Sequence, residues 1–249
     1  MTPRVPILTW HSLDDSGSVI STSPAAFRAQ VRRLREQGYE GVTLRELIDG
    51  WDGRAALPPR PVALTFDDGF RSVLEVAAPV LGESGFRATV FVVARACGGR
   101  NDWPGASRRI PTLPLLSAAD LLTLIDLGHE VGAHGLTHRR LDVMDVEDAE
   151  GEIAGARARL EDAVGCEVTA FAYPYGRTSE AVRRQVAAHY RAACTDELRV
   201  ASAGDDRHAL GRLDMYYFRT PVPLRLLGTR AGEAFVGLRR LGRRIRALA

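Results

Sequence analysis

The chain has 249 residues, of which 45% are hydrophobic and 26% charged, as is ordinary for a soluble globular protein. With a net charge of +2 we expect no nucleic-acid partner, and no apolar run is long enough to cross a bilayer. The N-terminus lacks the apolar region and cleavage site of a signal peptide, and the three cysteines have no metal-like spacing. These features predict a cytoplasmic protein with reduced thiols.

Apolar segments that are typical of strands alternate along the chain with helical segments. Ser23 before Pro24 predicts a helix start, and Phe27, Val31 and Leu34 then recur at helical spacing until Gly38. This alternation implies parallel βα units, and no linker favours two domains, so we expect one α/β barrel. The expected strands are 5–10, 39–43, 61–66, 88–93, 129–134, 168–172, 190–195 and 210–215, and the expected helices are 24–37, 44–50, 73–81, 117–127, 146–163 and 179–189.

Two adjacent carboxylates, Asp67 and Asp68, follow the apolar strand of residues 61–66, and Gly69 marks the turn that ends it. Ionised carboxylates side by side repel each other and lose hydration when buried, so a cation is the simplest compensation. Taken alone, the pair could equally be capping or turn aspartates.

Two histidines, His134 and His138, follow the strand expected at residues 129–134. Their spacing of four would place both imidazoles on one side of a helical turn. With one carboxylate they make a site of two histidines and one acid, which leaves positions open for water and substrate. A metal in such a site lowers the pKa of water and polarises a carbonyl. Because the carboxyl ends of parallel barrel strands converge on one face, we expect these residues to meet the two aspartates there.

At these residues the sequence resembles the polysaccharide deacetylases with a NodB-type domain, carbohydrate esterase family 4. Three segments carry the resemblance in the family's order, namely 65–69, 134–138 (preceded by 130–133) and 171–176, and the likeness extends over residues 5–215. It implies a distorted (β/α)7 barrel and a divalent metal, which we expect to be zinc, with cobalt or nickel as alternatives. It also implies hydrolysis of the acetyl group of an N-acetylated sugar or polysaccharide, with release of acetate.

The resemblance also implies roles for individual residues. Asp67 would be the general base, and the backbone N–H of Tyr175 would help to hold the oxyanion. We expect Pro174, Trp103 and Arg212 to contact the substrate. The metal ligands would be Asp68, His134 and His138.

Two positions depart from the family pattern. Ala172 stands where an arginine usually orients the base, and the last motif has Arg212 but no histidine acid. Arg212 lies at a strand end, from which it could supply the orienting charge. A subgroup similar to the poly-β-1,6-N-acetylglucosamine deacetylases supplies the acid from the first strand, and His11 matches that place. Asp14 and Asp15 follow closely and would hold its imidazole, although His11 could instead be a capping or packing residue.

Two other functions remain open. Some relatives of this fold hydrolyse cyclic amides, and a closed pocket would favour that reaction, whereas a groove would favour a glycan. The departures at Ala172 and in the last motif would also suit a glycan-binding domain that has lost its chemistry. The intact aspartates and histidines argue against such a loss, because buried charges are costly to keep.

The last residues of the chain form a basic segment. We expect a catalytic domain over 1–218 and a separate segment over 219–249, which holds eight arginines and one acid. Phe235, Leu238, Leu241, Ile245 and Leu248 recur every three or four positions, which predicts an amphipathic helix. This helix either packs on the barrel or docks peripherally on the inner face of a membrane. The sequence leaves the oligomeric state open.

Overall fold

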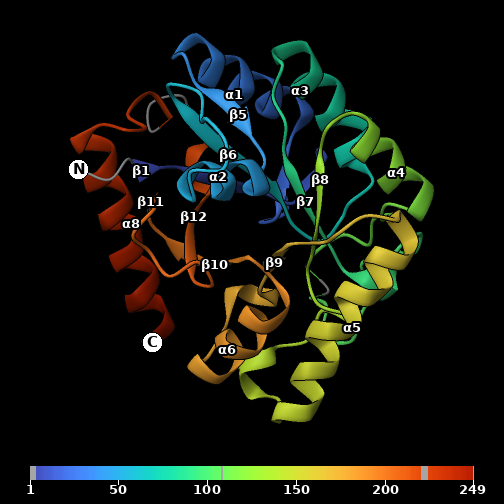
Figure 1. The fold of residues 1–249 in the computed structure, drawn as a ribbon. Coiled ribbons are helices and arrows are strands. Elements are labelled where there is room, and N and C mark those ends of the chain that lie inside the picture. The colour runs from blue at the N-terminus through green and yellow to red at the C-terminus, as the bar shows by residue number, and fades with distance from the viewer. Residues whose placement is uncertain (1–3, 108, 220–223, 249) are drawn as a thin grey trace.

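The structure is a computed structural model that describes residues 4–107, 109–219 and 224–248, with side chains up to Gly242. A closed barrel of seven parallel strands forms its centre, and helices surround it (Figure 1). Around the barrel the strands follow the order β2, β12, β10, β9, β8, β7 and β6, and β6 pairs with β2 to close the ring. Their bounds are Ile7–Trp10 (β2), Pro61–Phe66 (β6), Thr89–Val92 (β7), Glu130–Ala133 (β8), Ala170–Ala172 (β9), Ala192–Leu198 (β10) and Leu210–Asp214 (β12). The expected (β/α)7 barrel is therefore confirmed.

The barrel is distorted where the additional strand β5 (Glu40–Val42) joins it. Along one edge β6 pairs with β2. Along its other edge it pairs first with β5, through residues 61–63, and only then with β7, through Thr65 and Phe66. Two short strand pairs lie outside the ring: β1 (Arg4–Val5) with β11 (Ala201–Ser202), and β3 (Ser12–Leu13) with β4 (Ser21–Thr22).

The helices begin where the sequence places hydroxyl or carboxylate caps. The side chains of Ser23, Ser117 and Ser179 accept hydrogen bonds from the backbone of α1, α4 and α6, and Thr43 forms a capping box with Glu46 at α2. The segment expected as one helix at 73–81 is instead a π-turn, η1, followed by α3, because Pro79 has no N–H to continue an α-helical ladder. The helices are α1 (Pro24–Glu36), α2 (Leu44–Trp51), η1 (Val73–Ala77), α3 (Ala78–Ser84), η2 (Ala94–Ala96), α4 (Ala118–Asp126), η3 (Leu141–Val143), α5 (Val146–Val164), η4 (Pro174–Gly176), α6 (Glu180–His189), η5 (Met215–Phe218) and α8 (Arg230–Leu248).

The core has two parts, one between the barrel and the outer helices and one inside the ring. The inner part includes Ile7, Ala63 and Phe91 from the strands together with Leu44 and Leu47 from α2. Helix α2 lies across the barrel in Figure 1 and closes its amino end. The opposite end, at the carboxyl ends of the strands, is therefore the end left for a site.

Helix α8 lies along the outside of the barrel beside β10 and β11 (Figure 1). Val236 is buried, and Phe235 packs against Phe218 with 5.6 Å between ring centroids. Leu238 and Leu241 instead face solvent, so packing on the barrel explains only part of the apolar stripe. The side chains of Ile245 and Leu248 lie outside the described ones. Within the described residues no helix is both long enough and apolar enough to span a bilayer.

Candidate metal centre

The candidate site lies at the carboxyl ends of four strands, and its backbone is unusual there. Among the described residues, only Asp68, His138 and Tyr175 combine a side chain with a positive φ, at 70°, 62° and 58°. This left-handed conformation costs a residue with a Cβ roughly 1–2 kcal/mol, so it persists only where the surroundings enforce it. All three residues were expected in the site from the sequence. At Asp68 the turn ends the strand, so the carboxylates of Asp67 and Asp68 both lie in the site.

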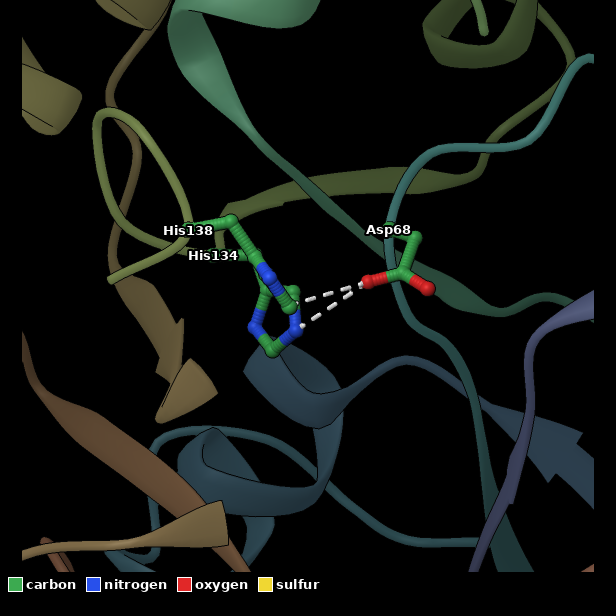
Figure 2. Close-up of side chains that lie close together, drawn as sticks. All are labelled: Asp68, His134 and His138. Carbon is green, nitrogen blue, oxygen red and sulfur yellow. Dashed lines mark ion pairs between the residues drawn. The ribbon is translucent and has the colours of Figure 1, made fainter. Parts of the chain in front are cut away.

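The carboxylate of Asp68 faces both imidazoles, as Figure 2 shows. Its Oδ1 lies 3.5 Å from Nε2 of His134 and 3.3 Å from Nε2 of His138. All three side chains are buried, and their ligand atoms lie within 4.8 Å of one another. The structure therefore brings the three expected ligands together.

The separations of these atoms fit a bound cation better than direct hydrogen bonds. Two ligand atoms on one tetrahedral zinc lie about 3.3–3.4 Å apart, given metal–ligand bonds of ~2.0–2.1 Å. An N–H···O hydrogen bond is usually shorter, near ~2.9 Å. Nδ1 of His134 lies 2.8 Å from the carbonyl oxygen of Ala172, which can only accept, so Nδ1 carries a proton and the neutral imidazole offers the lone pair of Nε2. The residues present therefore fit a divalent metal.

The expected helical turn between the two histidines is wrong. Residues 134–138 form a loop, in which Gly135 has a φ of 75° and His138 is left-handed. Glu152 of α5 holds this loop, because its carboxylate accepts hydrogen bonds from the backbone N–H groups of Leu136 and Thr137, at 3.0 and 2.9 Å, and from the Thr137 hydroxyl. A buried acid sixteen residues from Leu136 in sequence thus positions the loop that carries His138, an expected metal ligand.

Asp67 forms a two-pronged ion pair with Arg212 inside the barrel. Its two oxygens accept hydrogen bonds from Nη1 and Nη2 of Arg212 at 2.7 and 2.8 Å. Arg212 also donates from Nε to the carbonyl of Thr195 and from Nη1 to the hydroxyls of Thr9 and Thr65. The guanidinium therefore fixes the orientation of the Asp67 carboxylate.

The electrostatics of the site keep both aspartates ionised. Burial by itself raises the pKa of Asp67, but the Arg212 guanidinium outweighs it, helped by the imidazoles of His134 and His11, and the pKa lies below its usual value. Burial likewise opposes ionisation of Asp68, yet the imidazoles of His134 and His138 that face it hold the pKa of Asp68 well below its usual range. Two adjacent carboxylates thus carry charge in a buried site.

His11 lies at the same site, with its Nε2 3.8 Å from Oδ2 of Asp67, beyond hydrogen-bond distance. The expected support from Asp14 is wrong, because that carboxylate accepts hydrogen bonds from the Ser12 hydroxyl at 2.6 Å and from the backbone N–H of Ser16 at 2.8 Å. Among the described residues, neither Asp14 nor Asp15 pairs with His11. Asp67 is the acid that faces this imidazole.

A cavity of about 500 Å³ covers these residues. Trp103 and Tyr175 form part of its wall, and the two rings flank His138 with centroid separations of 4.4 and 4.6 Å. A second hollow of about 550 Å³ adjoins the first, and the two share Gly105, His138 and Tyr175 as lining residues. Arg212 lines the first hollow together with Asp67, Asp68, His11 and His134.

Pro174 is the one expected substrate contact that does not line the cavity. It is buried, and a Cβ added at Gly135 would lie 3.2 Å from its Cγ. Pro174 therefore packs against Gly135, in the loop that joins the two histidines. Trp103 and Tyr175, whose rings flank His138, were both expected in the site, whereas Glu152 was not. A single acid on the charged helix α5 gives no local signal in the sequence.

Comparison with known proteins agrees with the site. The sequence profile of the family described as polysaccharide deacetylase matches residues 54–193. YxkH of Bacillus subtilis (strain 168), which is named as a polysaccharide deacetylase, is 24% identical over 213 residues, 84% of this chain and 71% of that protein. The poly-beta-1,6-N-acetyl-D-glucosamine N-deacetylase of Escherichia coli (strain K12) is 34% identical over 77 residues, 30% of this chain but 12% of that protein.

Solved structures share the fold. The deacetylase PplD of Streptococcus pyogenes, in complex with acetate, superposes with a TM-score of 0.75 at 20% identity, over 86% of this chain and 93% of that chain. IcaB from Ammonifex degensii gives a TM-score of 0.74 at 24% identity, over 89% and 94% of the two chains. The chain belongs to the polysaccharide deacetylase family, whose members are hydrolases that act on the N-acetyl groups of polysaccharides.

Proposed function

We propose that this protein is a metal-dependent deacetylase that removes the acetyl group from an N-acetylated glycan and releases acetate. The observation that carries the proposal is the pairing of two buried units in one cavity, the Asp68–His134–His138 group and the Asp67–Arg212 ion pair. One unit can hold a metal and the other can hold a base in a fixed orientation. A metal that activates water and a base that takes its proton can together hydrolyse an amide.

The metal, when bound to Asp68, His134 and His138, would supply a water of lowered pKa and a positive charge next to the substrate carbonyl. We propose zinc as the native metal, since two imidazoles and one carboxylate are ligands that zinc accepts readily, with cobalt or nickel as substitutes.

Asp67 is proposed as the general base. Its carboxylate is ionised, buried and held by Arg212, so it can accept a proton from water without reorienting. Arg212 takes the place of the arginine that the family usually has at the position of Ala172. It is a positioning residue, because its donors already point at Asp67, Thr9, Thr65 and Thr195.

His11 is proposed as the general acid that protonates the leaving amine. An amine leaves poorly as an anion, and His11 is an imidazole that lines the cavity without belonging to the metal group. The left-handed turn at Tyr175 is proposed to aim its backbone N–H at the oxyanion. Trp103 and the Tyr175 ring are proposed to contact the sugar, since both form the cavity wall.

The shape of the cavity favours a glycan over a small cyclic amide. A second hollow adjoins the first at His138 and Tyr175, and we propose that a chain of sugars lies along both. A cyclic amide would need only the first hollow. The degenerate glycan-binding alternative is disfavoured by the complete set of ligands and by the base held next to them.

The test is acetate release from a panel of N-acetylated glycans, including oligomers of β-1,6-linked N-acetylglucosamine, by protein stripped with a chelator and reloaded with zinc, cobalt or nickel. We expect release only from the reloaded protein. Hydrolysis of allantoin in the absence of acetate release would favour the cyclic-amide alternative. Metal binding without turnover of any substrate would favour the degenerate one.

A further inference from the structure

The outer face of α8 is apolar where it turns away from the barrel. The exposed fractions of Leu238 and Leu241 are 71% and 56%, whereas Val236 on the barrel side is 8% exposed. A spacing of three residues places the two leucines on one face of the helix. Ile245 and Leu248 follow in the sequence at spacings of four and three residues. The barrel therefore leaves an apolar helix face uncovered.

Four other exposed aliphatic side chains lie next to acidic residues in the sequence. Leu122 and Leu127 lie in or next to α4 with Asp120 and Asp126, and the exposed valines 143 and 146 lie among acids from Asp142 to Asp148. On α8 the neighbours are arginines, and residues 219–249 hold eight arginines but one acid. Charge therefore distinguishes the α8 face from these four positions.

Several of these arginines, among those with described side chains, form no ion pair with an acidic residue of the protein. Within the described side chains, Arg225, Arg230 and Arg239 form no ion pair, although Arg240 lies 3.5 Å from Glu197. The Arg239 guanidinium lies over the rings of Phe235 and Tyr217, at 5.2 and 5.8 Å. Positive charge next to an apolar face complements a surface that offers anionic headgroups over hydrocarbon.

We propose that α8 docks this protein on an anionic lipid surface. Leu238 and Leu241 enter the headgroup boundary, and the unpaired arginines bind lipid phosphates. The ring of Tyr217 lines the catalytic cavity and also stacks beneath Arg239, so the docking helix lies one side chain from the cavity wall. A glycan tethered to a lipid could reach the site from such a surface.

The test is co-sedimentation with vesicles of phosphatidylcholine, with and without phosphatidylglycerol. We expect binding that requires phosphatidylglycerol and weakens as salt rises from about 0.1 M to about 1 M, over which the Debye length falls from ~10 Å to ~3 Å. Replacing Leu241 with aspartate (Leu241→Asp) should weaken binding ~10-fold or more. Leu127→Asp is the matched control, since Leu127 is also 56% exposed, and it should bind as the wild type does.

A second variant tests the charges separately, so that the proposal can still be tested if Leu241→Asp does not fold. Arg225→Gln with Arg230→Gln leaves the leucine face intact and should weaken binding by roughly fivefold per arginine, the equivalent of ~1 kcal/mol each. The proposal is overturned by absence of binding at low salt or by equal binding to vesicles without phosphatidylglycerol. Self-association that Leu241→Asp abolishes, without any vesicle binding, would assign the face to a second copy of the chain. Vesicle binding needs no catalysis, so its failure would leave the proposed activity untouched.

Discussion

The two ends of the barrel each bury an acid, and the surroundings of the two acids differ. At the carboxyl end, Asp67 pairs with Arg212 and its pKa lies below the usual value. At the amino end, Glu130 accepts hydrogen bonds from the Thr89 hydroxyl at 2.7 Å and the backbone N–H of Arg45 at 2.9 Å, and burial raises its pKa. One end keeps an ionised carboxylate, the proposed base, whereas the other end uses an acid to hold strands and α2 together.

The backbone conformation also differs between the two ends of the barrel. Among the described residues, the three left-handed ones with side chains all lie at the carboxyl end, in or next to the candidate metal site. The amino end is closed by regular elements, with Thr43 capping α2 and Leu44 donating its backbone N–H to Thr89. Backbone strain and ionised carboxylates are therefore concentrated where substrate can enter, as expected where function opposes stability.

Replacing Asp67 with asparagine should give the largest change in rate. The amide side chain of the Asp67→Asn variant keeps the shape and an acceptor for Arg212 but cannot take a proton, so acetate release should fall by ~10²–10⁴-fold. Steady-state assays with the reloaded variant measure this loss. A rate within a few fold of the wild type would remove Asp67 from the role of base.

Replacing His11 with alanine should affect amides more than esters. Without a general acid the amide rate should fall by about 10²-fold, the lower part of the range for such groups, because the amine leaves poorly unprotonated. An acetate ester should lose less, since an alkoxide leaves more readily. Equal losses on the two substrates would show that His11 does not protonate the leaving group.

Replacing Arg212 with lysine should have a smaller effect. The lysine keeps the positive charge but cannot form both prongs to Asp67, and one charged hydrogen bond is worth about 1.5–3 kcal/mol. We therefore expect a fall in rate of roughly 10–100-fold with metal content unchanged. A loss of metal in this variant would indicate that Arg212 supports the fold of the site and not only its base.

Replacing Glu130 with glutamine should have the smallest effect, with the catalytic rate unchanged. Because burial raises the pKa of Glu130 above 4.5, the folded wild type loses stability as pH rises through that range, and the glutamine variant should not. Thermal melts at a series of pH values from acid to neutral should show that the melting temperature of the variant rises relative to that of the wild type. A drop in rate comparable to that of Asp67→Asn would break the distinction between the two ends.

Much of this arrangement could be predicted from local sequence. The apolar segments and their turns place Asp67, Asp68 and the histidines at strand ends, and the hydroxyl caps mark the helix starts. The pairing of Arg212 with Asp67 spans 145 positions in the chain, so only the family pattern suggested it.

Other features depend on contacts that no local pattern reports. A hydrogen bond from the loop to Glu152, and not a helical turn, sets the place of His138. The Asp14 carboxylate binds its neighbouring serines instead of His11. The sequence placed the leucines of α8 in one stripe, but only the packed barrel decides that Phe235 and Val236 face inward while Leu238 faces out.

The central claim is that two neighbouring aspartates divide the work, with Asp68 binding the metal and Asp67 moving the proton. Metal content of purified Asp67→Asn and Asp68→Asn, measured side by side after reloading with zinc, tests this claim most directly. The account predicts that Asp67→Asn keeps its metal and Asp68→Asn loses it, while both lose activity. Loss of metal from Asp67→Asn and retention by Asp68→Asn would contradict it.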